Sequence, residues 1–221
     1  CVAHDEWDLV LEVLDVMKEA GHRQIRSTYR ASLQACKSVQ NAGSAKEILS
    51  AMKLANVPPE IIDYELVIST MCQRNRIDRN AWWRSALHLQ REAAETQMQD
   101  LSVATYEAIF RCLTDDRQWK ESLRLLKFME ETGADSFNKT RPALSTYRNI
   151  LECCVSSNQV EQAVQVLHSC HRAGLVPTQR DFELVIVALS KKLQGRRALQ
   201  LMDWMEILKI RRTRAIYNAV L

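Results

Sequence analysis

Glycine and proline are scarce in this 221-residue sequence, which has 5 Gly and 4 Pro. That scarcity excludes a β protein with many short strands, because such folds need frequent turn formers. Long apolar runs are missing too, and no stretch approaches the length of about 18 residues that indicates a membrane-spanning helix. Disorder is excluded because 47% of the residues are hydrophobic and 26% are charged. We therefore predict an all-α protein.

An excess of charge of one sign is also missing. The sequence has 30 Lys and Arg against 27 Asp and Glu, which gives a formal net charge of +3. A protein whose whole surface is drawn to polyphosphate carries a larger excess. The overall charge therefore neither requires nor excludes a nucleic acid partner.

Signatures of catalysis and of metal binding are absent as well. No GxSxG motif, Gly-rich phosphate loop or HExxH motif occurs, so we expect no enzymatic activity and no cofactor within these residues. The 7 Cys form no CxxC pair, which favours reduced thiols over a zinc site or a disulfide framework. His168, Cys170 and His171 share a predicted helix but lack further ligands, so we predict no metal site. Adjacent Cys153 and Cys154 point in different directions on a helix and are interpreted as core residues.

What the sequence does contain is a repeated aromatic motif. An aromatic residue, preceded in most copies by Thr or Asp and followed by a charged or polar residue, recurs at Tyr29, Tyr64, Tyr106, Tyr147, Phe182 and Tyr217. The intervals between these positions are 35, 42, 41, 35 and 35 residues. In five of the six copies an apolar pair follows three and four residues after the aromatic, which places the pair on one helix face. The spacing predicts that each unit begins with an amphipathic helix.

A second helix is predicted in each unit from a column of small residues. Ala45, Ser122, Ala163 and Ala198 each follow an aromatic residue by 16 positions, and an apolar pair comes three and four residues later. Neither helix of a unit can bury its apolar face alone, so the units must stack on their neighbours. We predict a single helical-repeat solenoid of about five helix-turn-helix units over residues 1–221.

The unit boundaries follow from the aromatic positions. We predict a partial repeat at 1–26, repeats at 27–61, 62–103, 104–144, 145–179 and 180–214, and the start of a sixth at 215–221. The extra residues of the second and third repeats are predicted around 76–83 and 131–143. Because the sequence begins and ends inside a repeat, we expect it to be a fragment of a longer protein.

The 35-residue period, the Thr-Tyr or Asp-Phe opening of a unit and the segment Gly174-Leu175-Val176-Pro177-Thr178 resemble the pentatricopeptide repeat. The resemblance implies a superhelix that acts in mitochondria or chloroplasts and binds single-stranded RNA along its first helices, at one base per repeat. In that family, the residue after the aromatic and the last residue of the repeat together recognise the base edge. These two residues mostly have small amide or hydroxyl side chains there.

At the same positions this sequence has larger side chains, and several of them are charged. The pairs are Arg30 with Glu60, Glu65 with Ser102, Glu107 with Ala143, Arg148 with Thr178, and Glu183 with Thr213, and Asn218 opens the last unit. A carboxylate at such a position repels the phosphates of a bound strand. Two hypotheses therefore stay open, namely RNA binding, single-stranded or structured, within a larger ribonucleoprotein, and a protein-interaction scaffold in an organellar complex that does not recognise RNA bases.

Other candidate contacts lie outside these pairs. Lys191, Lys192, Arg196, Arg197, Lys209, Arg211, Arg212 and Arg214 form a basic C-terminal stretch that could neutralise phosphates or simply be solvated. Trp82 and Trp83, beside Arg79 and Arg84, could stack on bases or anchor a partner, although packing is the alternative. We predict that Trp7, Trp119 and Trp204 lie in the core.

Overall fold

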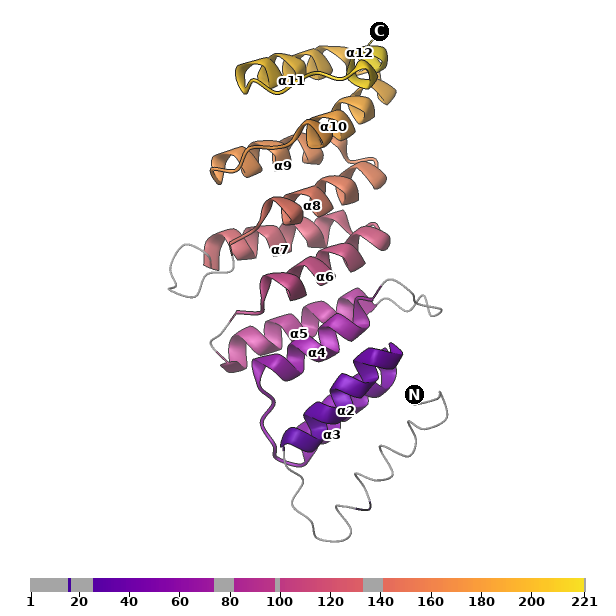
Figure 1. The fold of residues 1–221 in the computed structure, drawn as a ribbon, viewed down its shortest axis with the longest axis vertical. Helices are drawn as coiled ribbons and strands as arrows, with labels where there is room; N and C mark the ends of the chain where they lie inside the picture. The colour runs from indigo at the N-terminus through magenta and orange to yellow at the C-terminus, as the bar shows by residue number, and fades with distance from the viewer. Residues whose placement is uncertain (1–15, 17–25, 74–81, 98–99, 133–140, 221) are drawn as a thin grey trace. The chain divides into compact units, whose positions relative to one another are not determined.

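The computed structural model describes residues 16, 26–73, 82–97, 100–132 and 141–220. The elements of this part are helices (Figure 1): α2 (Arg26–Val39), α3 (Ala42–Leu54), α4 (Ile61–Met71), α5 (Trp82–Gln97), α6 (Val103–Asp115), α7 (Trp119–Thr132), α8 (Leu144–Ser156), α9 (Val160–Arg172), α10 (Gln179–Lys191), α11 (Gly195–Ile207) and α12 (Arg214–Val220). The prediction of the all-α class is confirmed. None of these described helices has the length and apolar composition needed to cross a membrane.

The chain divides into two compact units, residues 1–112 and 113–221, with the boundary inside α6. In the first unit α2 packs on α3, α4 packs on α5, and α4 also contacts both α2 and α3. In the second unit α8 packs on α9 and α10 on α11, while α10 also contacts α8 and α12 (Figure 1). Each of these first helices therefore contacts the second helix of its own repeat and the first helix of a neighbouring repeat. The assignment of the whole chain to one solenoid with the predicted repeat boundaries stays a prediction.

The aromatic column forms the core of both units. Tyr29, Tyr64, Tyr106, Tyr147 and Phe182 are at most 2% exposed. The small residues of the second helices, Ala45, Ser122, Ala163 and Ala198, are fully buried, which lets the two helices of a repeat approach closely. The last aromatic residue differs, since Tyr217 is 47% exposed and Ile216 is the buried residue of α12. Among the described helices, α12 packs on α10 and α11, and no helix after α12 covers the ring of Tyr217.

The helices end at turns with a recurring left-handed residue. Gln40, Arg117, Asn158 and Leu193 have φ between 54° and 63°, and each lies 11 residues after an aromatic of the column. Asn56, Gly174 and Lys209 take the same conformation between consecutive repeats. A left-handed residue at a helix C-terminus lets the following N–H groups satisfy the last carbonyl groups, as when Gln194 N bonds to Leu189 O at 3.0 Å. The turns therefore repeat with the same period as the core.

Candidate nucleic-acid interface

Arg30, the first of the predicted base-recognition residues, joins α2 to α4. Its Nε donates to Asp63 Oδ1 at 2.8 Å, and its Nη2 donates to Glu60 Oε2 at 2.8 Å. Asp63 is fully buried and also accepts a hydrogen bond from the Glu60 backbone N–H at 2.8 Å, which caps α4. Hydrogen bonds to Asp63 and then to Glu60 raise the pKa of Arg30 above its ordinary value. Arg30 therefore contacts both its predicted partner, Glu60, and a buried carboxylate beside it.

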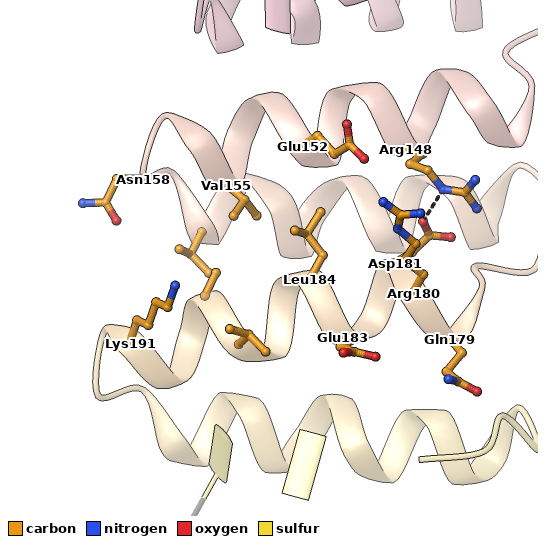
Figure 2. A pocket seen from close by; sticks show the side chains of 13 residues that line it. Arg148, Glu152, Val155, Asn158, Gln179, Arg180, Asp181, Glu183, Leu184 and Lys191 are labelled. Carbon is orange, nitrogen blue, oxygen red and sulfur yellow. Dashed lines mark hydrogen bonds and ion pairs between the residues drawn. The ribbon is translucent and has the colours of Figure 1, made fainter. Parts of the chain in front are cut away.

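Arg148 repeats this arrangement between α8 and α10. Its Nε donates to Asp181 Oδ1 at 2.9 Å (Figure 2). Its Nη2 donates to Thr178 Oγ1 at 3.2 Å. Asp181 is 2% exposed and accepts hydrogen bonds from the backbone N–H and the hydroxyl of Thr178, both at 2.7 Å. The hydrogen bond to Asp181 raises the pKa of Arg148, although burial acts in the opposite direction. We call these two contacts, Arg30 with Asp63 and Arg148 with Asp181, the arginine clamps.

Two further predicted pairs are also in contact, but without an arginine. The backbone N–H of Ser102 donates to Glu65 Oε1 at 2.5 Å, and the Thr213 hydroxyl donates to Glu183 Oε2 at 3.2 Å. Each hydroxyl residue sits just before the next first helix: the Ser102 hydroxyl lies 3.0 Å from that of Thr105, and Thr213 Oγ1 accepts from Ile216 N at 3.3 Å. We call these the glutamate contacts.

The remaining predicted residues are the pair Glu107 and Ala143, which belong to different units, and Asn218. Glu107 is half-buried in α6 and belongs to the first unit, whereas Ala143 precedes α8 in the second and offers no side-chain cap. Asn218 is exposed on α12. In four of the five predicted pairs, therefore, the two residues are neighbours, and each pair is closed by its own hydrogen bond.

The residues that complete the arginine clamps were missed in the sequence, although a signal for them exists. Where the aromatic is followed by Arg, the next aromatic is preceded by Asp, as in Asp63-Tyr64 and Asp181-Phe182. Where the aromatic is followed by Glu, the residue before the next aromatic is Thr105, Thr146 or Ile216. A comparison of each repeat with the following one, rather than of columns within a repeat, would have found this pairing.

A groove with a volume of about 660 Å³ lies along α8 and α10 in the second unit (Figure 2). Its floor is aliphatic and includes Val155, Leu184 and Val187. Figure 2 shows Lys191 at one end and Arg180, close to the Arg148 clamp, at the other. Glu152 also lines the groove and makes no hydrogen bond or ion pair with the residues that the structure describes. The first helices thus present an apolar surface with charged ends.

The basic C-terminal stretch surrounds two different turns. Lys191, Lys192, Arg196 and Arg197 surround the α10–α11 turn, whereas Lys209 to Arg214 surround the α11–α12 turn. The 13 residues of α11 separate these turns by about 20 Å, at about 1.5 Å per residue. Residues near each other in sequence therefore lie at opposite ends of a helix.

Some of these cations are engaged within the protein. Lys192 Nζ donates to Asn158 O at 2.5 Å, and Arg197 pairs with Glu161 at 2.8 Å. Arg212 donates to Glu206 at 2.6 Å and to Met202 O at 2.9 Å. The side chains of six exposed residues make no hydrogen bond or ion pair within the described part of the chain, namely Arg180, Lys191, Arg196, Lys209, Arg211 and Arg214. We call these six residues the unpaired cations.

The tryptophans occupy the surface more than predicted. Trp119 and Trp204 are half-buried rather than core residues, and Trp7 and Arg79 lie outside the described residues. Trp204 stacks on His168 with ring centroids 4.6 Å apart and contacts His171 and Phe182 edge-on. A tryptophan bridging three helices keeps part of its large ring at the surface. Trp82 and Trp83 begin α5 and are half-buried, with the Arg84 guanidinium 5.1 Å from the Trp83 ring.

The described cysteines and the two histidines of α9 contribute to packing. His168 and His171 contact the Trp204 ring, and no group of three or more metal-ligating side chains occurs among the described residues. Cys36, Cys72, Cys112, Cys153, Cys154 and Cys170 are buried and free. Burial raises the pKa of Cys154 to about 12 and those of Cys36 and Cys170 to about 11. Such thiols carry little thiolate at neutral pH and are weak nucleophiles.

Comparisons with known proteins agree with this architecture. Residues 12–74 match the family model of the pentatricopeptide repeat domain. The fold matches the crystal structure of the pentatricopeptide repeat protein PPR10 from maize, with a TM-score of 0.65 and 18% identity over 98% of this chain and 29% of that one. It also matches the pentatricopeptide repeat domain of Arabidopsis thaliana protein-only RNase P 1 in complex with tRNA, with a TM-score of 0.64 and 10% identity.

Coverage differs between these structures. This chain matches 94% of the Arabidopsis domain over 86% of its own length. A structure of PPR10 in complex with an 18-nt psaJ RNA element has a TM-score of 0.50 and 11% identity, over 97% of this chain and 34% of that one. The chain thus spans about a third of the PPR10 structures that it matches. The search of curated proteins found no match.

Proposed function

We propose that this chain, which contains a pentatricopeptide repeat domain and has the fold of that family's proteins, is a non-catalytic RNA-binding protein of mitochondrial or chloroplast gene expression. In this proposal it works as a subunit of a larger ribonucleoprotein. The first helices face the RNA, with the groove along α8 and α10 as the best-defined part of the surface.

The observation that carries the proposal is the shared fold. Two of the matching structures, PPR10 and the protein-only RNase P 1 domain, are complexes with RNA. The unpaired cations on α10, α11 and α12 support the proposal independently, because exposed Lys and Arg without protein partners are free to neutralise phosphates. The organelle and the ribonucleoprotein follow from the family resemblance.

The alternative function, a protein-interaction scaffold, is favoured by a different observation. Four of the five base-recognition pairs are closed by hydrogen bonds between their own members. A protein with such pairs can use its first helices to bind another subunit of an organellar complex. The two functions differ in whether RNA lies on the chain in the cell.

Crosslinking in the cell distinguishes them. The full-length protein is tagged, irradiated in intact cells and purified under denaturing conditions, and the covalently bound RNA is labelled and sequenced. The proposal expects organellar RNA, with a signal that falls when Lys191, Arg196, Arg211 and Arg214 are all changed to Gln. Purification of the complex under native conditions from the same cells identifies its protein subunits. A fixed set of subunits with no more crosslinked RNA than an untagged control would support the scaffold and contradict the proposal.

A further inference from the structure

We infer that this chain holds single-stranded RNA through its phosphates, by the unpaired cations of α10–α12, and does not select bases with the paired positions that follow the aromatic column. The inference rests on the proposed RNA-binding function and specifies the kind of RNA site. It makes the chain a sequence-tolerant RNA binder. Three observations carry it, one from the pairs, one from the groove and one from the charges.

The arginines of the paired positions are held by the protein itself. Arg148 uses Nε and Nη2 on Asp181 and Thr178, and Arg30 uses the same two atoms on Asp63 and Glu60. Turning either arginine toward a base would leave a carboxylate that is at most 2% exposed without its cation. A buried charge without a partner is strongly unfavourable. The clamps therefore hold Nε and Nη2 of both arginines, and these two atoms cannot turn toward a base edge.

The groove accepts bases without identifying them. Recognition of a base edge needs hydrogen-bond donors and acceptors at fixed positions. The floor offers Val155, Leu184 and Val187, whose side chains have neither. The side-chain amides that line the groove, Asn158 and Gln179, lie at its two ends (Figure 2). Packing against a base face is available to all four bases. Glu152, the unpaired carboxylate of the groove, repels phosphates from the floor and favours their placement at its ends.

The positive charge of the chain is concentrated where the unpaired cations lie. Residues 191–214 contain eight Lys or Arg and two acidic residues, Asp203 and Glu206, although the whole chain has a net charge of only +3. Lys191 lines the groove itself, as does Arg180 at its other end (Figure 2). Contacts from Lys and Arg to phosphates position a strand and carry no sequence information. The surface beside the groove is thus suited to hold an RNA backbone.

The test measures affinity against base identity and salt. The 221-residue chain is titrated into fluorescently labelled oligo(U), oligo(C) and oligo(A) of equal length, and anisotropy gives Kd over a series of salt concentrations. We expect the three Kd values to agree within about threefold, as packing and phosphate contacts are sequence-tolerant. The logarithm of Kd should rise with the logarithm of salt concentration, by a slope of about 0.7 for each phosphate contact.

Charge variants identify the contacts. The double variants Lys191→Gln with Arg196→Gln, and Arg211→Gln with Arg214→Gln, should each lower the slope by about 1.4 and weaken all three strands alike. Lys46→Gln removes an exposed cation from the second helix α3 and should leave Kd and slope unchanged. Glu152→Gln should tighten all three strands equally. Circular dichroism checks that each variant is folded.

Two results would overturn the inference, and they are distinguishable. A preference of more than about tenfold for one base, lost in Arg148→Ala or Glu152→Gln, would contradict sequence-tolerant binding but leave RNA binding itself intact. Failure of all three strands to bind at low salt would remove both the inference and the proposed function. Equal affinities with a salt slope that falls in the two double variants would support the inference.

Discussion

The α8–α10 junction is closed by an arginine on a buried aspartate, whereas the α10–α12 junction, one repeat later, is closed by a glutamate on a threonine hydroxyl. Both contacts start from the residue that follows an aromatic of the core. They differ because Asp181 precedes the aromatic of α10, while the buried Ile216 takes that place in α12. A buried carboxylate needs a cation and an aliphatic side chain does not. The residue that precedes an aromatic of the core thus matches the residue that follows the aromatic of the preceding repeat.

The first unit contains the same contrast. Arg30 is held by Asp63 at the α2–α4 junction, and Glu65 accepts from the backbone of Ser102 ahead of α6. The recurrence in two units shows that charge at these positions serves the contact between consecutive first helices. A position that a family uses for base recognition can thus have a structural role in an individual repeat.

The largest effect that separates the two junction types is expected from removing a clamp. Arg148→Ala leaves Asp181 buried without its cation and should lower the free energy of unfolding by about 1.5–3 kcal/mol, the value of a hydrogen bond to a charged group. Urea denaturation followed by circular dichroism measures it. Arg180→Ala, which removes a neighbouring exposed arginine, should change stability by less than about 0.5 kcal/mol. Equal effects of the two changes would show that the clamp is not stabilising.

A transplanted clamp tests whether the pairing rule is sufficient. The changes Glu65→Arg and Thr105→Asp give the α4–α6 junction the arginine and the aspartate of the two arginine clamps. Ser102 then stands in the place of Thr178. Thr105 is 4% exposed, so an aspartate there should destabilise the protein unless the arginine introduced at position 65 neutralises it. A double-mutant cycle should give a favourable coupling of about 1–2 kcal/mol. Additive effects would mean that the junction differs in its backbone and not only in its residues.

The pH dependence of stability should distinguish two carboxylates that accept a hydrogen bond from a core tyrosine. Glu92 pairs with a lysine, whereas Glu130 has no ion pair among the described residues. Glu92 on α5 accepts from Tyr64 at 3.0 Å and pairs with Lys53 at 2.5 Å, whereas Glu130 in the second unit accepts from Tyr147 at 2.9 Å. Burial acts to raise the pKa of Glu92, but the hydrogen bonds from Lys53 and Tyr64 outweigh it and the pKa lies below its ordinary value of 4.5.

The stabilisation that Glu92 provides is therefore present above pH 4.5 and is lost as the pH falls through the lowered pKa of the folded state. At pH 7, Glu92→Gln should cost about 1 kcal/mol, at the upper end for a partly exposed ion pair. The difference from the wild type should shrink as urea denaturation is repeated at lower pH. A difference that does not shrink as the pH falls below 4.5 would contradict the assignment.

The smallest effect is expected at a glutamate contact. Glu183→Ala removes one hydrogen bond between half-buried groups and leaves the Thr213 hydroxyl able to bond to water. The free energy of unfolding should fall by about 0.5 kcal/mol, the low end for a hydrogen bond. Thr213→Val, which removes the other partner and the cap of Ile216 N, should cost slightly more. A loss as large as that of Arg148→Ala would erase the distinction between the junctions.

The sequence was sufficient for the fold because the fold depends on periodic burial. Tyr29, Tyr64 and Phe182 recur at the helical-repeat spacing, and the structure buries all three. The exposed Tyr217 shows the limit of this argument, since a column predicts burial only where a neighbouring helix covers it. The half-buried Trp204 was misplaced for a related reason, because its ring bridges helices at the surface.

The site was less predictable because it depends on single contacts. Arg148 and Asp181 are 33 residues apart, and their pairing has no periodic signal within one repeat. The left-handed turn residues Gln40, Arg117 and Leu193 share a conformation but no side-chain type, so they cannot be found by composition. The division of the basic stretch between two turns could not be found from a count of charges, because it depends on the length of α11.

The most direct test of the account is to identify the residues that touch RNA. The purified chain is crosslinked by ultraviolet light to a uridine-rich single strand, digested, and analysed by mass spectrometry for peptides that carry a nucleotide. The account predicts crosslinks within residues 152–160 and 179–220, around the groove and the unpaired cations, and their loss in the Gln variants. Crosslinks concentrated at Arg30, Glu65 and Arg148, with none between residues 191 and 214, would contradict it.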